Sequence, residues 1–208
     1  GNWYQIITGL PAQPAVNGAV NLTPSGGSLS AVSLDSHGTR IFVGTTGSSA
    51  GVYQVQSDQS LTPMLPLPQS LALAFSDERQ TLYALDGAGN QVYEINLTDS
   101  SVQSWTIPGL LNPVALRTGQ DSRQRPVLYV AGGTDQALAV YEATSHASIT
   151  VVPLDFSPIV VEILGRHSFV LRDRTGDTDP LWSFTDTSDS LSVYFVPATP
   201  PAASGGLQ

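Results

Sequence analysis

Two kinds of short apolar segment recur along this chain with nearly the same period, and this repetition constrains the fold more than any other feature. The first kind follows a polar turn, and its aromatic residues lie 41, 46 and 40 residues apart at Phe42, Tyr83, Tyr129 and Phe169. The second kind follows a Gly-rich or Asp-rich turn, and its aromatic residues lie 40, 48 and 41 residues apart at Tyr53, Tyr93, Tyr141 and Trp182. Two independent markers with one period indicate an internal repeat of 40 to 48 residues.

Each repeat contains two further strand candidates, one at its start and one at its end. The starts are residues 29–34, 70–75, 113–118 and 159–164, and the ends are residues 61–67, 102–107, 149–154 and 191–196. Segments rich in Val, Ile, Leu, Tyr and Phe alternate with clusters of Gly, Asp, Asn, Ser and Pro, and helical periodicity is nearly absent, so we predict an all-β chain. The predicted repeats are residues 29–68, 69–110, 111–155 and 156–197.

A four-stranded sheet of this size cannot bury both of its faces by itself, but it can bury them against similar neighbours. The predicted fold is therefore a β-propeller with about four four-stranded antiparallel blades. Small residues in the first strands, such as Ala31, Ala72 and Ala115, suit the crowded centre of such a fold. The aromatic residues of the second and third strands suit the wider space between blades.

Several segments resemble a known repeat. The runs Leu34-Asp35-Ser36-His37-Gly38-Thr39-Arg40-Ile41-Phe42-Val43 and Phe75-Ser76-Asp77-Glu78-Arg79-Gln80-Thr81-Leu82-Tyr83-Ala84 resemble the S-P-D-G-x-x-L-Y-V core of YVTN-type β-propeller repeats. The run Leu128-Tyr129-Val130-Ala131-Gly132-Gly133 resembles the L-Y-V-A-N that follows this core. Both turn motifs lack the proline, and the fourth repeat keeps little of the pattern. The resemblance implies the propeller architecture, and members of this family include surface-layer proteins, lactonase-like enzymes and cofactor-binding dehydrogenases.

The number of blades in the complete ring is left open by the sequence. Residues 1–28 read as an N-terminal strand, which resembles the last strand of a preceding blade, followed by a Pro/Gly-rich connection over residues 11–27. Residues 198–208 read as a low-complexity tail. Three arrangements remain: a small propeller of four or five blades, part of a larger ring, or a ring completed by a second chain. We favour a fragment or a paired half-propeller, because open edge strands promote association.

Composition excludes several classes of function. The net charge is −9, and all 8 basic residues are arginine, which argues against binding to nucleic acid and to anionic lipid. The chain has 0 cysteines, which excludes disulfides, thiol nucleophiles and Cys-ligated metals. No apolar run is long enough for a transmembrane helix, so we expect no membrane insertion.

A metal site is one interpretation of the acidic loop in the fourth repeat. Asp173, Asp177 and Asp179 flank Gly176, and closely spaced carboxylates suit calcium, which takes six to eight oxygen ligands. Their spacing does not match the EF-hand loop. The favoured interpretation is a hairpin loop in which Asp and Gly form the turn. Calcium is the one cofactor that the sequence suggests, and no other is expected.

The remaining candidates are histidines, a glycine-rich segment and aromatic residues. His37, His146 and His167 all have turn-like surroundings, so exposed turns are favoured over a zinc site assembled from different blades. Residues 86–90 lack the third glycine and the following helix of a nucleotide-binding fingerprint, so we predict a hairpin turn. Among the aromatic residues, Trp3 and Tyr4 are the best candidates for an interface. Trp105 and Trp182 are predicted to contribute to packing within and between blades.

The predicted function is that of a binding or scaffold propeller, without enzymatic activity, of the bacterial cell envelope or exterior. The acidity of the chain, its lack of lysine and its polar Ser/Thr/Gln surface favour a periplasmic, cell-surface or secreted location. Loops on a rigid ring would contact a protein partner or mediate self-association. The alternative is a lactonase-like hydrolase with a site in the central channel. Only Arg117 and Glu162 are ionisable on the inner strands, whereas an enzyme usually needs several convergent polar groups. A self-assembling envelope protein is a third hypothesis.

Overall fold

The computed structural model describes residues 3–8, 15–21, 26–164, 168–173, 181–187 and 190–196, with side-chain surroundings over residues 26–163. The chain divides into two compact units, the N-terminal unit Gly1–Thr106 and the C-terminal unit Ile107–Gln208. Every regular element in the described residues is a β-strand, and none of them is a helix that could span a membrane. The all-β prediction is confirmed.

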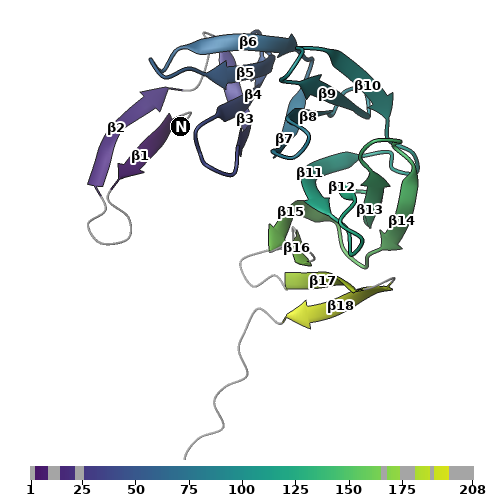
Figure 1. Cartoon of the computed structure of the whole chain (residues 1–208). Helices are drawn as coiled ribbons and strands as arrows, with labels where there is room; N and C mark the ends of the chain where they lie inside the picture. The colour runs from purple at the N-terminus through teal and green to yellow at the C-terminus, as the bar shows by residue number, and fades with distance from the viewer. Residues whose placement is uncertain are drawn as a thin grey trace, which may run out of the picture. The chain divides into compact units, whose positions relative to one another are not determined.

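The N-terminal unit contains one two-stranded sheet and two four-stranded antiparallel sheets (Figure 1). The two-stranded sheet pairs β1 (Trp3–Thr8) with β2 (Ala15–Asn21). The next sheet runs in the order β3 (Gly27–Leu34), β4 (Ile41–Gly47), β5 (Gly51–Val55) and β6 (Leu61–Pro66). The following sheet has β7 (Ser70–Ser76), β8 (Thr81–Asp86), β9 (Gln91–Asn96) and β10 (Val102–Thr106) in sequence order.

The C-terminal unit repeats the same topology twice. Its first sheet consists of β11 (Pro113–Gln120), β12 (Pro126–Gly132), β13 (Ala137–Glu142) and β14 (Ser148–Pro153). Its second sheet consists of β15 (Pro158–Leu164), β16 (Ser168–Asp173), β17 (Leu181–Thr187) and β18 (Ser190–Val196). Each strand in these sheets pairs with its neighbours in sequence, so every sheet is a simple meander.

The sheets also share a backbone irregularity that the sequence motifs do not reveal. The pairing of the first and second strands shifts at the same place in each four-stranded sheet. The shifts lie at Leu29/Ala31, Ser70/Ala72, Pro113/Ala115 and Pro158/Val160. Such a bulge bends and twists the strand locally. Its recurrence gives an alignment of the four sheets that is independent of residue type.

Apolar faces of successive sheets pack against each other within each unit. In the N-terminal unit β3 lies beside β7, and Phe42 of β4 stacks on Phe75 of β7 with ring centroids 5.3 Å apart. Gly44 of β4 lies so close to Ser70 of β7 that a Cβ atom there would collide with the Ser70 hydroxyl. In the C-terminal unit β11 lies beside β15, and the core contains Ala115, Val127, Tyr129, Ala131, Leu138, Val140, Phe156 and Val161. The sheets therefore bury their faces against one another, as the repeats predict.

The interpretation of residues 11–27 as an uninterrupted connection is wrong, because Ala15–Asn21 forms β2. The segment contains Asn and Gly, which are depleted in strands, and this composition concealed the strand. Pairing explains how it forms: Trp3 and Tyr4 of β1 lie opposite Asn21 and Val20, so a short hairpin supplies the hydrogen-bonding partner that the composition does not suggest.

Most hairpin turns contain a residue with positive φ, and most of these residues are not glycine. Gln59, Ser100 and His146 occupy this conformation between the third and fourth strands of three sheets, at φ values of 70°, 60° and 60°. The left-handed conformation brings Cβ close to the following carbonyl oxygen, which costs an L-residue roughly 1–2 kcal/mol. The backbone is therefore locally strained at these three turns.

Gln59→Gly is expected to raise the free energy of unfolding by about 0.5–1 kcal/mol, because glycine removes the Cβ clash but gains entropy in the unfolded chain. Gln59 is exposed, and its backbone bond to the Gln56 carbonyl is retained. Chemical denaturation measures the change. The matched control is Gln69→Gly, an exposed position without positive φ, where the same replacement should destabilise. A loss of stability in both variants would contradict the conclusion that the backbone is strained at Gln59.

Candidate functional site

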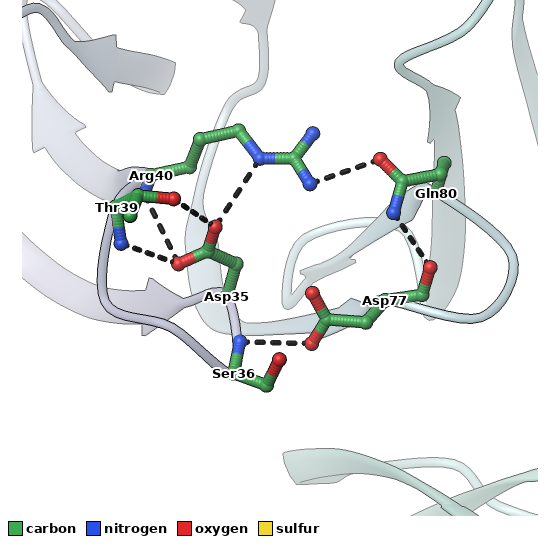
Figure 2. A network of polar contacts seen from close by, with 6 residues as sticks. All are labelled: Asp35, Ser36, Thr39, Arg40, Asp77 and Gln80. Carbon is green, nitrogen blue, oxygen red and sulfur yellow. Dashed lines mark hydrogen bonds and ion pairs between the residues drawn. The ribbon is translucent and has the colours of Figure 1, made fainter.

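The turn between β3 and β4 is organised around the buried carboxylate of Asp35. Thr39 donates to it twice, from its backbone N–H at 2.6 Å and from its hydroxyl at 2.5 Å, and the Arg40 backbone N–H donates at 3.1 Å. Figure 2 shows these bonds converging on the two carboxylate oxygens. The carboxylate therefore satisfies the backbone donors of Thr39 and Arg40, and such side-chain-to-backbone bonds stabilise a turn.

Arg40 extends from this turn to the next sheet. Its Nε lies 3.5 Å from Asp35 Oδ2, and its Nη2 donates to Gln80 Oε1 at 2.9 Å (Figure 2). The guanidinium carbon is 4.7 Å from the centroid of the Phe75 ring, a cation–π distance. The Ser36 N–H also donates to Asp77 Oδ2 at 2.8 Å. The Arg40–Gln80 and Ser36–Asp77 bonds thus join equivalent turns of neighbouring sheets, while Asp35, Gln80 and the Phe75 ring hold Arg40 in place.

The hydrogen bonds to Asp35 make the stability of the protein sensitive to acid. The hydroxyl of Thr39, followed by the backbone N–H groups of Arg40 and Thr39, lowers the pKa of Asp35 from 3.8 to about 2. A lowered pKa means that the ionised form stabilises the fold, so this contribution is complete above pH 4 and is lost as the pH falls through 2.

We therefore expect the stability difference between the wild-type chain and Asp35→Asn to shrink as the pH is lowered from 5 to 2. Thermal unfolding at several pH values measures this difference. Asp155→Asn, at an exposed position in the connection before β15, is the control and should change stability little. A difference for Asp35→Asn that stays constant down to pH 2 would contradict the role of its charge.

A cavity of about 460 Å³ lies beside Arg40, between the outer strands of the two sheets of the N-terminal unit. Strand β6 contributes Pro63 and Met64, and β9 contributes Ile95 and Asn96. The remaining lining residues are Arg40, Gln54, Leu97, Ser100 and Val102. The cavity is therefore built from strands together with the turns that hold Arg40, Leu97 and Ser100, and turns are the parts of such sheets that most often carry binding residues.

The cavity combines an apolar lining with hydrogen-bonding groups. Met64 and Leu97 are half-buried and belong to the apolar contacts between the two sheets. Gln54 is half-buried, and Asn96 uses its Oδ1 to accept from the Thr98 N–H at 2.8 Å, which leaves its amide nitrogen for other contacts. A few polar groups on an apolar lining are typical of sites that bind small molecules or peptide side chains.

The C-terminal unit repeats the carboxylate–arginine turn. Asp121 accepts from the N–H groups of Arg123 and Arg125 at 2.9 and 2.8 Å, and its carboxylate pairs with the Arg125 guanidinium at 2.6 Å. The two ionisable residues predicted on the inner strands also meet: Arg117 Nη2 lies 2.6 Å from Glu162 Oε1, and its Nε donates to Oε2 at 3.1 Å. This bidentate pair joins β11 to β15.

Several residues predicted from the sequence lie partly or wholly outside what the structure describes. Asp173 is the last residue of β16, and Asp177 and Asp179 lie outside the described residues, so the calcium site stays a prediction. Within the described residues no group of three or more His, Asp and Glu side chains suits a metal ion. Trp3 and Tyr4 belong to β1, but their side chains are not described, so their interface role also stays a prediction.

The histidines and Trp105 have the following surroundings. His37 is exposed in the turn between β3 and β4, and His146 occupies the turn between β13 and β14; His167 lies outside the described residues. Trp105 of β10 donates from Nε1 to Glu94 Oε1 at 2.9 Å. Gln103 donates to the other carboxylate oxygen of Glu94, also at 2.9 Å. Trp105 therefore contributes to contacts within its own sheet.

The residues around the cavity do not form a recognisable group in the sequence. Arg40 and Gln80 are 40 residues apart, and each belongs to a turn that looks polar and solvated when read alone. Gln54 lies within a repeated strand segment, Asn96 begins an Asn-Leu-Thr acceptor pattern for glycosylation, and Met64 belongs to no motif, so none of the three was assigned to a cavity. The one feature of the sequence that could have indicated these contacts was the repeat itself. Residues one period apart lie at equivalent places in adjacent sheets.

Comparison with known proteins identifies the fold. No family model and no curated protein matches the sequence. Among solved structures, the chain is similar to Kuenenia stuttgartiensis hydrazine synthase, with a TM-score of 0.65 and 13% identity over 86% of this chain and 52% of that chain. It is also similar to the RRP9 WD40 repeats, with a TM-score of 0.63 and 13% identity over 83% of this chain and 52% of that chain.

A third similar structure is a luciferin-regenerating enzyme, with a TM-score of 0.62 and 17% identity over 94% of this chain and 71% of that chain. At these identities the likeness concerns the fold alone. The chain spans about half the length of the first and second of these structures. The predicted fold class is confirmed: the protein is all-β, and its blade-like four-stranded sheets have the β-propeller fold.

Proposed function

We propose that this chain is a binding scaffold of the propeller type, without enzymatic activity, that takes a short segment of a partner protein into the cavity beside Arg40. The observation that carries the proposal is the composition of this cavity, in which Met64 and Leu97 offer apolar contact while Arg40 and Asn96 offer hydrogen-bond donors. A peptide presents the same combination, because each residue has a backbone carbonyl beside its side chain.

The rigidity of the lining supports the same role. Arg40 is held by Asp35, Gln80 and the Phe75 ring, so a ligand that accepts a hydrogen bond from it need not immobilise a flexible side chain. Preorganised groups reduce the entropic cost of binding. The similarity to WD40 repeats also supports a scaffold that binds proteins.

Selection of random peptides displayed on phage against the purified chain tests this proposal. We expect selected peptides to bind the wild-type chain, and to bind Met64→Asp at least about tenfold more weakly, because the new carboxylate must be desolvated next to apolar contacts. Gln54→Ala should also weaken binding. Gln69→Ala, at an exposed position that does not line the cavity, is the matched control.

Two results would overturn the proposal. The first is that repeated selection enriches no peptide above background. The second is that the enriched peptides bind Met64→Asp and Gln69→Ala as tightly as the wild-type chain, because such peptides would occupy another surface.

A lactonase-like hydrolase is the second candidate, and the likeness to the luciferin-regenerating enzyme favours it. In this case the Arg117–Glu162 pair on β11 and β15 would supply the ionisable groups of the site. Hydrolysis of a panel of lactones, lost in Glu162→Gln with retained folding, would support it. Absence of turnover with and without added Ca²⁺ or Zn²⁺ would count against it.

The remaining parts of the proposal concern family and location. The repeated turn-and-strand runs at residues 34–43 and 75–84 support membership of the YVTN-type repeats. The charged fraction of 12% and the absence of lysine support a periplasmic, cell-surface or secreted location. Fractionation of the native bacterial host, with the chain detected by antibody, tests the location, and recovery only with cytoplasmic markers would overturn it.

A further inference from the structure

The fourth strand of the first C-terminal sheet, β14, has an edge at which no described strand pairs. Strand β14 stands at one end of that sheet and pairs with β13 alone among the described strands (Figure 1). On the side of the core, Val152 of β14 and the following Leu154 pack against the cluster that contains Tyr129 and Phe156. The core therefore holds β14 in place, and its open edge presents backbone N–H and C=O groups to which another strand can bind.

The residues of β14 favour such pairing. Ile149 is 41% exposed and Val151 is 42% exposed, so the strand offers two large apolar side chains to solvent. Residues 149–152 are all β-branched, which favours an extended backbone. Residues 147–152 contain no charged residue and no proline. A segment with this composition at a sheet edge is prone to pair with another strand.

The corresponding strands of the N-terminal unit are less suited to pairing. Pro63 and Pro66 lie within β6, and proline has no backbone N–H to donate. Strand β10 exposes one large apolar side chain, that of Val102. The one proline of β14, Pro153, is its last residue, so residues 148–152 keep their backbone donors. Of these three strands, β14 therefore has the edge that is least protected against association.

Strand β14 is complementary to itself when two copies run antiparallel. His146 lies two residues before β14, and Asp155 lies two residues after it. An antiparallel second copy therefore brings its Asp155 close to His146 of the first, and an imidazole N–H can donate to a carboxylate. Because residues 147–154 are uncharged, two chains of net charge −9 can approach along this edge with little repulsion. A two-fold contact requires a self-complementary surface of this kind.

We propose that the open edge of β14 pairs with β14 of a second copy of this chain, antiparallel about a two-fold axis at Val151. In this register Val151 of each copy lies opposite Val151 of the other, and Thr150 lies opposite Val152. The pairing of β14 with β13 is irregular at Ile149 and regular from Thr150 onward, so the register uses the regular part of the strand. Two four-stranded sheets thereby become one continuous sheet. The inference does not depend on the proposed function.

The dimer should be weak and reversible, because one pair of strands is a small interface. Interfaces that bury less than about 1,200 Å² in total belong mostly to transient complexes. We therefore expect the dimer to be populated only at protein concentrations of about 100 μM and above.

Sedimentation velocity of the full chain between about 10 μM and 1 mM tests the proposal. The sedimentation coefficient of the wild-type chain should rise from that of a monomer towards that of a dimer. Val151→Asp should raise the dissociation constant at least about tenfold, because two carboxylates then meet directly opposite each other. Val32→Asp is the matched control, since Val32 is 44% exposed on β3 and undergoes the same change of charge. This control should leave the association unchanged.

Cross-linking tests the register. The chain has 0 cysteines, so a single introduced cysteine can form a disulfide only with another copy. Residues directly opposite in antiparallel strands have Cα atoms about 4.5–5.5 Å apart, which suits a disulfide. Under mild oxidation Val151→Cys should therefore yield covalent dimer faster than Val32→Cys, as measured by electrophoresis without reducing agent.

Circular dichroism must show that the aspartate variants remain folded, as expected for exposed positions. The cysteine variants keep the proposal testable if Val151→Asp does not fold. The proposal is overturned if the wild-type chain stays monomeric up to about 1 mM, because the edge is then open or covered by another protein. It is also overturned if Val151→Asp associates like the wild-type chain, if Val32→Asp alone abolishes association, or if the two cysteine variants cross-link equally fast.

Discussion

Phe42→Ala is expected to lower the free energy of unfolding by about 3–5 kcal/mol, the range typical of a fully buried phenylalanine. Phe42 is completely buried between the two sheets of the N-terminal unit, where its ring stacks on that of Phe75 at a centroid distance of 5.3 Å. Truncation removes the transfer free energy of the ring and leaves a cavity that two rigid sheets cannot easily close. Chemical denaturation with fluorescence detection measures the loss.

Val102→Ala is the control for this measurement, because Val102 is exposed and its truncation should change stability by less than about 0.5 kcal/mol. Equal and small effects of the two substitutions would mean that Phe42 does not lie between packed sheets.

The largest expected effect is that of Leu138→Asp, which should prevent the C-terminal unit from folding. Leu138 is completely buried on β13 in the cluster that contains Tyr129 and Phe156. An ionised carboxylate without a partner in such surroundings costs several kcal/mol. Loss of the leucine packing costs about 2–5 kcal/mol more, and the sum is comparable with the roughly 5–15 kcal/mol by which most domains are stable. A two-dimensional nitrogen–proton NMR spectrum measures the result. If the unit is unfolded, its residues lose their dispersed amide resonances.

Leu138→Met is the matched variant, because methionine keeps the volume and the apolar character and should cost less than about 1.5 kcal/mol. A folded Leu138→Asp variant with an unchanged melting temperature would place Leu138 at the surface and would disagree with the proposed inter-sheet core.

The sequence predicted the strands of the repeats because their chemistry is local. Tyr83 and Tyr93 each lie in a short segment that contains apolar residues and is bounded by turn residues, so the period could be measured without a structure. Strand β2 was missed for the opposite reason. Its residues have weak strand propensity, and its partner β1 decides its conformation.

Contacts between repeats could not be predicted from the sequence as the strands could. The bond from Arg40 to Gln80 and that from Ser36 to Asp77 depend on the offset between two sheets, which the sequence does not state. Arg117 and Glu162 lie on β11 and β15, the first strands of their sheets, as the repeat boundaries predicted, but their pairing depends on how β11 and β15 are placed side by side. The cavity depends on all of these placements together.

The turn conformations show a further reason why local reading is incomplete. Glutamine gives no signal for positive φ, yet Gln59, Gln80, Gln124 and Gln136 all adopt it. Closure of the hairpins by paired strands provides the stabilisation that offsets this local strain. Such positions become visible only when equivalent turns are compared between sheets.

The central claim is that repeated sheets pack face to face, and one contact between protons tests it most directly. Phe42 and Phe75 belong to different sheets, and their ring centroids lie 5.3 Å apart. We expect a strong nuclear Overhauser effect between the ring protons of these two residues in the folded protein. If both rings are assigned and no such effect is found, their separation is too large for packed faces, and the account is contradicted.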